Sequence, residues 1–247
     1  MSANDSLLTA GAHRTLKHTI LHRDLLEEQY HDLAQQHEAA AGGMWVFLAT
    51  EVMFFGAVFA ALGIYRYLYG EAFEAASVKL NWVIGGINTL VLLTSSLTAV
   101  LAVHQARLGS QRGIVACLAL TALLGTTFLG LKGLEYYTDY QENLIPGWRF
   151  DPHEWTNEGL SVAQVSQVKL FLVFYWVMTL IHALHVTIGI GVMFVLMLLA
   201  RRGSFSSQYY SPVDVAALYW HFVDVVWIFL LPMLYLLGTH SGERLGL

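Results

Sequence analysis

The amino-acid sequence predicts an all-α polytopic membrane protein, built as a bundle of five transmembrane helices. Of its 247 residues, 56% are hydrophobic and only 13% are charged, whereas soluble domains carry about 25% charged residues. The charged residues are also segregated, because positions 113–131 hold none and positions 213–238 hold only Asp214 and Asp224. A composition of this kind cannot supply the polar surface of a soluble domain.

Five segments have the length and apolar composition of a membrane-crossing helix, which needs roughly 20 such residues. The predicted spans are 44–69, 80–104, 113–137, 168–200 and 213–238. Residues 138–167 form the one long connection, a polar loop with Pro146, Gly147 and Pro152 in which we expect a helical turn. The chain therefore divides into a polar N-terminal segment (1–43), one membrane domain (44–238) and a C-terminal tail (239–247).

The N-terminal segment contains several histidines and lacks the apolar middle and cleavage site of a secretory signal. Apolar residues recur at roughly helical spacing from Leu16 to Leu33, which allows an amphipathic surface helix. His18 and His22 have an i, i+4 spacing that can hold a metal ion. A solvated helix face is the better interpretation, because no further ligand is clearly placed.

The distribution of basic residues indicates the orientation of the chain, because cytoplasmic loops carry an excess of Lys and Arg. Loops 105–112 and 201–212 each contain two arginines and lie on the same side as the N-terminal segment, which adds three basic residues. The loop at 138–167, on the opposite side, is acidic. We therefore expect the N-terminus in the cytoplasm and the C-terminus outside, in the periplasm.

Several function classes are excluded or disfavoured. A net charge of -5 argues against a nucleic-acid partner, which would require a basic face. The single cysteine, Cys117, excludes an intrachain disulfide and any Cys-pair metal centre. The sequence contains no phosphate-binding loop, dinucleotide-binding turn or nucleophile elbow. No catalytic set of residues is therefore predicted, and the polar residues inside the spans are expected to meet other chains.

Glu51 is the first of several ionisable residues inside the predicted spans, where each costs about 2.5–3.5 kcal/mol to insert. It lies about 10 Å along its helix from Met44, too deep for a short carboxylate to reach the interface easily. Two interpretations remain open. Glu51 is either a proton-linked carboxylate that faces protein, or a buried hydrogen-bonded acid that fixes helix contacts.

Three histidines and an aspartate lie inside the last two spans. His182 and His185 share one face of the fourth span, and His221 and Asp224 share one face of the fifth. An aspartate that accepts a hydrogen bond from an imidazole would satisfy both groups without water. In the alternative interpretation, the histidines would be axial ligands of a haem.

Two further pairs lie near the ends of spans. Lys132 and Glu135, near the external end of the third span, are expected to form an ion pair whose members can reach the interface. Arg201 and Arg202, at the cytoplasmic end of the fourth span, are candidates for a lipid phosphate or a subunit interface, since a guanidinium suits phosphate. The general excess of basic residues on the cytoplasmic side of membrane proteins explains these two arginines at least as well.

Five stretches of the sequence resemble subunit III of the haem–copper terminal oxidases, the cytochrome c oxidase subunit III family. The stretches are ATEVMFFGAVFAA at 49–61, INTLVLLTSSLTA at 87–99, GLEYYTDY at 133–140, IHALHVTIGIG at 181–191 and YWHFVDVVWIFLLPMLY at 219–235. They occur in the order of the family and extend over essentially the whole membrane domain.

The resemblance implies a non-catalytic subunit of a respiratory oxidase in the bacterial plasma membrane. It implies partner subunits that hold the haem and copper, namely catalytic subunit I with subunit II. A small subunit IV and a respiratory supercomplex are left open as further partners. This chain would hold bound phospholipid but no haem, copper or other metal, and would support proton or oxygen supply. Glu51 would correspond to the intramembrane carboxylate of the family, with the imidazole of His185 or His221 as its partner.

Alternatives within and outside the family remain. The larger family members have seven spans, with lipid bound in a cleft between the first two helices and the other five, and this chain lacks the first two. Five-span members occur in cytochrome c oxidases, quinol oxidases and nitric-oxide-reductase-associated proteins. Outside the family, a free-standing b-type cytochrome would use His182 and His221 as haem ligands, and a proton-coupled transporter would use Glu51.

Overall fold

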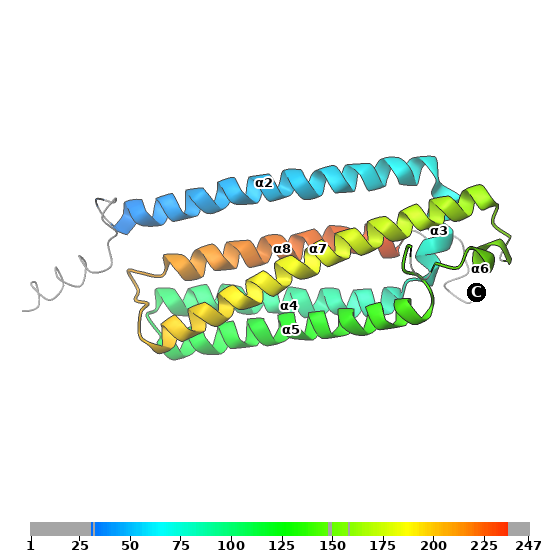
Figure 1. Ribbon diagram of the computed structural model, residues 1–247. Helices are drawn as coiled ribbons and strands as arrows, with labels where there is room; N and C mark the ends of the chain where they lie inside the picture. The colour runs from blue at the N-terminus through cyan, green and yellow to red at the C-terminus, as the bar shows by residue number, and fades with distance from the viewer. Residues whose placement is uncertain (1–30, 32, 148–149, 158, 237–247) are drawn as a thin grey trace, which may run out of the picture.

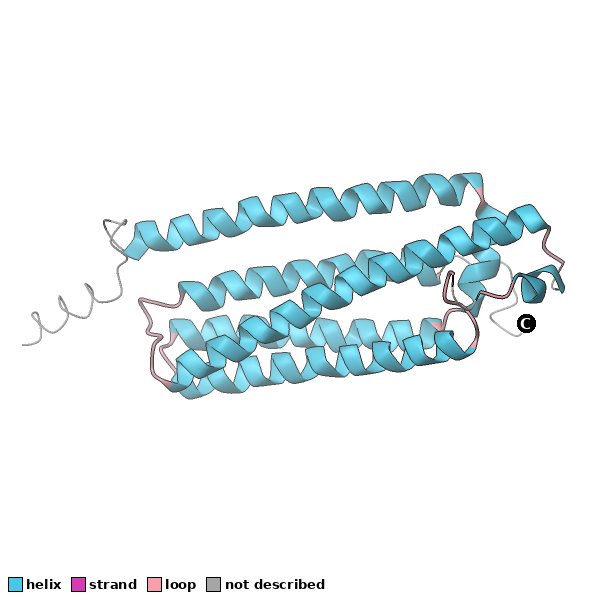
Figure 2. Ribbon diagram, viewed as in Figure 1, coloured by secondary structure: helices cyan, strands magenta, loops and turns pink. Residues whose placement is uncertain are grey.

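The fold is a set of seven helices, seen here in a computed structural model that describes residues 31, 33–147, 150–157 and 159–236. The helices are α2 (Leu33–Leu68), α3 (Gly70–Lys79), α4 (Trp82–Arg107), α5 (Gln111–Gln141), α6 (Pro152–Asn157), α7 (Val162–Arg201) and α8 (Ser211–Tyr235). The described residues contain no β-strand (Figure 2). Five of the helices are long and apolar enough to cross a membrane, which confirms the predicted class of fold.

The helices differ from the predicted spans mainly at their ends. α2 begins at Leu33, so the expected boundary at residue 43/44 falls inside a helix. α5 and α7 both extend into the polar loop, because hydropathy marks only the part of a helix that crosses the hydrocarbon. The loop also contains α6, the expected helical turn. The expectations for residues 1–30, including His18 and His22, and for the tail at 239–247 lie outside the described residues.

Side-chain caps mark the start of α4 and of α7. The Asn81 side chain accepts hydrogen bonds from the backbone N–H groups of Val83 and Ile84 at the start of α4. Ser161 and Gln164 form a capping box at the start of α7, in which each side chain bonds to the backbone of the other. These caps satisfy N–H groups that have no partner within the helix, and they stabilise the first turn of α4 and of α7.

α4, α5, α7 and α8 form a four-helix bundle, and α2 lies along one side of it against α8 and, less closely, α7 (Figure 1). α3 and α6 lie at the end of the bundle where α2 finishes. α3 is a helix that the sequence analysis missed, and it buries Ala72, Phe73 and Ala76.

Trp220 of α8 contacts three other helices of the bundle, α4, α5 and α7. Its side chain is fully buried, and its indole N–H donates to the Ser95 Oγ of α4 at 3.0 Å. A Cβ atom added at Gly125 of α5 or Gly189 of α7 would lie 2.7 Å from the indole ring. Both positions therefore require glycine, since any side chain there would displace the ring.

Candidate functional site

Glu51 of α2 and His185 of α7 form an ion pair inside the membrane-spanning region. Their Oε2 and Nε2 atoms are 3.3 Å apart, and the side chains are 19% and 15% exposed, respectively. His185 is thus the partner of Glu51, one of the two imidazoles expected from the sequence. Phe55 packs its ring edge against the His185 ring, with ring centroids 5.4 Å apart, so the pair has an aromatic neighbour on the α2 side.

The second contact of His185 fixes the orientation of its ring. Its Nδ1 lies 2.8 Å from the Ile181 carbonyl oxygen. A carbonyl oxygen only accepts, so Nδ1 is the nitrogen that donates to the α7 backbone. Nε2 is then the nitrogen that faces the Glu51 carboxyl group. The imidazole therefore bridges the backbone of α7 and the carboxyl group of α2.

His221 and Asp224 of α8 do not bond to each other, so the expected pairing is wrong. His221 Nδ1 instead contacts the Ser96 Oγ of α4 at 2.6 Å. Asp224 is only 3% exposed, and within the described part of the chain neither of its carboxyl oxygens has a hydrogen bond of normal geometry. Ser96, its polar neighbour, is already engaged by the imidazole. The predicted His221–Asp224 hydrogen bond does not form because the Ser96 hydroxyl of α4 lies beside the His221 ring and takes its place.

His182 points into the bundle, although it lies one turn from His185 on the same helix. It is 1% exposed and packs between the rings of Phe128 and Trp227, at centroid distances of 5.6 and 5.1 Å. Neither ring nitrogen has a hydrogen-bond partner among the described residues. His182 and His221 therefore have different neighbours. No three His, Cys, Asp or Glu side chains in the described ranges are arranged to hold a metal ion.

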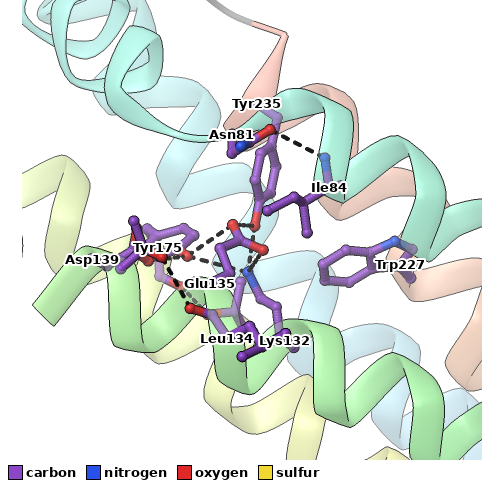
Figure 3. Close-up of polar contacts among 12 residues, drawn as sticks. Asn81, Ile84, Lys132, Leu134, Glu135, Asp139, Tyr175, Trp227 and Tyr235 are labelled. Carbon is purple, nitrogen blue, oxygen red and sulfur yellow. Dashed lines mark hydrogen bonds and ion pairs between the residues drawn. The ribbon is translucent and has the colours of Figure 1, made fainter.

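Lys132 and Glu135 of α5 form the predicted ion pair, with 3.1 Å between Lys132 Nζ and Glu135 Oε2. The expectation that both reach the interface is wrong, because the side chains are only 1% and 2% exposed. They turn into the bundle, where α7 and α8 provide polar partners close to the end of the membrane-spanning region (Figure 3).

Two tyrosines and an aspartate complete this buried group, which we call the lysine cluster: Lys132, Glu135, Asp139, Tyr175 and Tyr235. Lys132 Nζ donates to both tyrosine hydroxyls, at 3.2 Å for Tyr175. Tyr175 donates in turn to Asp139 Oδ2 at 2.6 Å, and Tyr235 donates to Glu135 Oε1 at 2.6 Å. The cluster therefore combines the Lys132–Glu135 ion pair with hydrogen bonds from both hydroxyl protons, and it joins α5, α7 and α8.

Aromatic rings surround the ammonium group of Lys132 as well. The ring centroids lie 4.8 to 5.6 Å from Nζ and belong to Tyr136, Tyr175, Trp227 and Tyr235. An ammonium group is attracted to aromatic faces at such distances, and more strongly when both are desolvated. These contacts partly replace the water that the lysine would have at the interface.

Three members of the lysine cluster, Asp139, Tyr175 and Tyr235, were not predicted from the sequence. Asp139 follows Lys132 by seven residues and Glu135 by four, so helical spacing alone places all three on one face of α5. That spacing was a usable signal. Tyr175 and Tyr235 carried no such signal, because their roles depend on how α7 and α8 are rotated against α5.

Arg201 and Arg202 end α7, and both side chains are exposed. Arg201 lines a groove between the end of α7 and the start of α5, whereas Arg202 is not among the residues that line it. The two arginines that the sequence treats alike therefore differ in their surroundings.

Comparisons with known proteins agree with the resemblance. Residues 150–239 match the family model of cytochrome c oxidase subunit III. The quinol oxidase subunit 3 of Bacillus spizizenii is 34% identical over 203 residues, which covers 79% of this chain and 86% of that protein. The cytochrome c oxidase subunit 3 of Thermostichus vulcanus is 32% identical over 196 residues (79% and 86%), and that of Gadus morhua is 32% identical over 233 residues (88% and 78%). With a membrane-spanning helix bundle and relatives of this extent, the chain belongs to the subunit III family of haem–copper oxidases.

Proposed function

We propose that this chain is a non-catalytic subunit of a bacterial cytochrome c oxidase, in which a neighbouring subunit I reduces oxygen. The observation that carries this proposal is the lysine cluster. Its charged groups are 1–3% exposed and are linked through the hydroxyls of Tyr175 and Tyr235, so they hold helices together and are not presented to a substrate. The haem and copper belong, in this proposal, to the partner subunits, with subunit II and a small subunit IV completing the complex.

A quinol oxidase is the second candidate, and a specific observation favours it. The relative from Bacillus spizizenii is named as a quinol oxidase subunit, and it is as similar to this chain as the relatives named for cytochrome c oxidase. The residues that would bind the electron donor lie in another subunit under either proposal, so the role of this chain is the same in both.

Glu51 and His185 are the residues to which we assign the support of proton supply. A carboxyl group and an imidazole can share a proton, and this pair is formed by a single polar contact between α2 and α7. A single contact is easier to open than a network, so a proton shared by the two groups can be exchanged without unfolding a helix. His182, His221 and Asp224 are assigned to helix packing around it.

The proposed orientation places the N-terminus in the cytoplasm of a bacterial cell and the C-terminus outside. Arg107, Arg112, Arg201 and Arg202 lie at the end of the bundle where α2 begins, and the acidic loop with α6 lies at the opposite end (Figure 1). This segregation agrees with the positive-inside rule. We further propose that the arginines at the cytoplasmic end hold phospholipid.

The test is a Glu51→Gln variant of the purified oxidase complex. The glutamine keeps the shape of the side chain but removes the exchangeable proton. We expect unchanged haem content and initial electron transfer, because the haem belongs to partner subunits in this proposal. We expect a faster loss of activity during sustained turnover. Haem spectra and activity over time measure the two effects. A variant complex that loses its haem spectrum outright would contradict the non-catalytic assignment.

Glu71→Gln is the matched control. Glu71 lies in α3, outside the five spans, and contacts Gln164 through its side chain at 3.1 Å. The same chemical change there should leave both the haem spectrum and the durability of the complex as in the parent.

A further inference from the structure

Two buried polar side chains in the interior of the bundle lack protein partners. Asn88 of α4 is 0% exposed and His182 of α7 is 1% exposed. Within the described part of the chain, the amide nitrogen and oxygen of Asn88 and both ring nitrogens of His182 have no hydrogen-bond partner. Buried polar groups in folded proteins almost always bond to a protein group or to an ordered water. These four atoms therefore need a partner that the surrounding side chains do not supply.

The two side chains lie at the same level of the bundle, which follows from a neighbouring layer of known contacts. In that layer, Trp220 of α8 donates to Ser95 of α4 and lies against Gly189 of α7. Seven residues are about two helical turns, so a step of seven returns to the same face of a helix. Asn88 is seven residues before Ser95, and His182 is seven residues before Gly189. Because α4 and α7 begin at the same end of the bundle, both steps lead to one layer (Figure 1).

The contacts within this second layer support the same register. Trp227 of α8 lies beside His182, with ring centroids 5.1 Å apart. Its indole N–H donates to the hydroxyl of Thr89, the residue next to Asn88, at 3.1 Å. Phe128 of α5 completes the layer, at centroid distances of 4.9 Å from Trp227 and 5.6 Å from His182. Aromatic rings from α5 and α8 thus lie in the same layer as the unpartnered polar groups of α4 and α7.

α4 and α7 occupy diagonal positions in the bundle, since each of them packs on both α5 and α8. A group that joins Asn88 to His182 must both donate and accept, because an amide and a neutral imidazole each offer donors and acceptors. It must also be small, because both side chains are closed off from the surface. A metal ion does not fit, since no three His, Cys, Asp or Glu side chains of the described residues could hold one. Water has the required size and chemistry.

We propose that Asn88 and His182 bind an ordered water molecule that bridges α4 and α7 at the centre of the bundle. A buried water makes about three hydrogen bonds, and these two side chains offer enough donors and acceptors for them. The bridge connects two helices that stand diagonally and holds the His182 ring against Trp227. The site lies inside the chain, so it does not depend on the function proposed above.

The first test is a density map of the purified oxidase complex at a resolution that shows ordered water. We expect a density peak about 2.7–3.2 Å from a polar atom of Asn88 and of His182. In an Asn88→Leu variant, which keeps nearly the same side-chain volume, this peak should be lost while Phe128 and Trp227 keep their positions. A direct hydrogen bond between Asn88 and His182 in the parent map, or no peak within reach of both, would overturn the site.

Thermal unfolding of the same complexes tests whether the two residues share one water. Asn88→Leu and His182→Leu should each lower the unfolding temperature by about 2–4 °C, because each leaves the polar atoms of the other residue without a partner. The double variant removes both polar groups together with the water, so it should be no less stable than either single variant. Losses that add in the double variant would overturn the shared water.

Thr94→Val is the matched control, because it also removes a polar group from α4. The Thr94 side chain is exposed, and its hydroxyl donates to the Leu90 carbonyl of its own helix at 2.8 Å. The unfolding temperature and the density peak beside His182 should both stay as in the parent. Loss of the peak in this variant would contradict the assignment of the water to Asn88 and His182.

Discussion

The lysine cluster and the Glu51–His185 pair solve the same problem, a charge inside a membrane protein, in opposite ways. The lysine cluster holds its ion pair at 1–2% exposure and surrounds it with two tyrosine hydroxyls, a second carboxylate and aromatic rings. The Glu51–His185 pair is 15–19% exposed and consists of one contact between two helices. Both sites join helices that are distant in sequence, but only the first is built as a network of several hydrogen bonds.

This difference separates a permanent connection from an adjustable one. A buried charge that loses its partner leaves an uncompensated group in a medium of low dielectric constant, so a cluster of this kind rarely opens. The Glu51–His185 pair loses less when it opens, because a single polar contact is broken rather than a network. We therefore assign the connection of α5, α7 and α8 to the lysine cluster, and proton exchange to the Glu51–His185 pair.

The largest expected effect comes from Lys132→Met. The variant leaves the buried carboxylates of Glu135 and Asp139 without a cation. We therefore expect a loss of about 3–5 kcal/mol in the free energy of unfolding. Thermal unfolding of the purified complex measures it. Lys79→Met is the control, because Lys79 contacts Glu154 at 3.5 Å with 30% and 45% exposure, and such pairs contribute about 0–1 kcal/mol.

The double variant Lys132→Met/Glu135→Gln tests the cause of that loss. Removing both charges leaves no uncompensated ion at Glu135, so part of the stability should return. A double variant that is less stable than Lys132→Met would show that the lysine acts through packing alone.

A smaller effect is expected from Tyr235→Phe. The change removes a hydroxyl that donates to Glu135 at 2.6 Å and accepts from Lys132, with little change in shape. Leaving such buried groups without a partner costs about 1–3 kcal/mol. Tyr137→Phe is the matched control, since Tyr137 is 61% exposed on the same helix as Lys132. Equal unfolding temperatures for the two variants would contradict the role assigned to Tyr235.

The smallest effect on stability is expected from Glu51→Gln. The glutamine amide can still donate to His185 Nε2, because Nδ1 keeps its bond to the Ile181 carbonyl. We expect a change of about 1 kcal/mol or less in the free energy of unfolding. Hydrogen exchange of α2 backbone amides provides a local measurement. A destabilisation as large as that of Lys132→Met would remove the distinction between the two sites.

The extent to which the sequence predicted these features follows from the range of the interactions. Five spans were predictable because composition over about 20 residues determines them. The sequence narrowed the partner of Glu51 to two histidines, His185 and His221, because the position of a residue along a helix gives its depth in the membrane. The bond between His221 and Ser96 joins residues 125 positions apart, and no local pattern indicates which side chain of α4 faces α8.

The lysine cluster shows where a local pattern sufficed and where it did not. The spacing of Lys132, Glu135 and Asp139 already places three charged residues on one face of a helix. Whether that face is buried depends on the packing of α7 and α8, which supply Tyr175 and Tyr235. A charged face near the end of a span is therefore ambiguous in sequence, and the tertiary contacts decide it.

We propose, as the central claim, that the ionisable residues of this chain connect helices and bind no redox cofactor. Removing this chain from the purified oxidase complex and measuring haem in both fractions tests that claim most directly. We expect all of the haem absorbance to stay with the remaining subunits. Haem that leaves the complex together with this chain would contradict the claim.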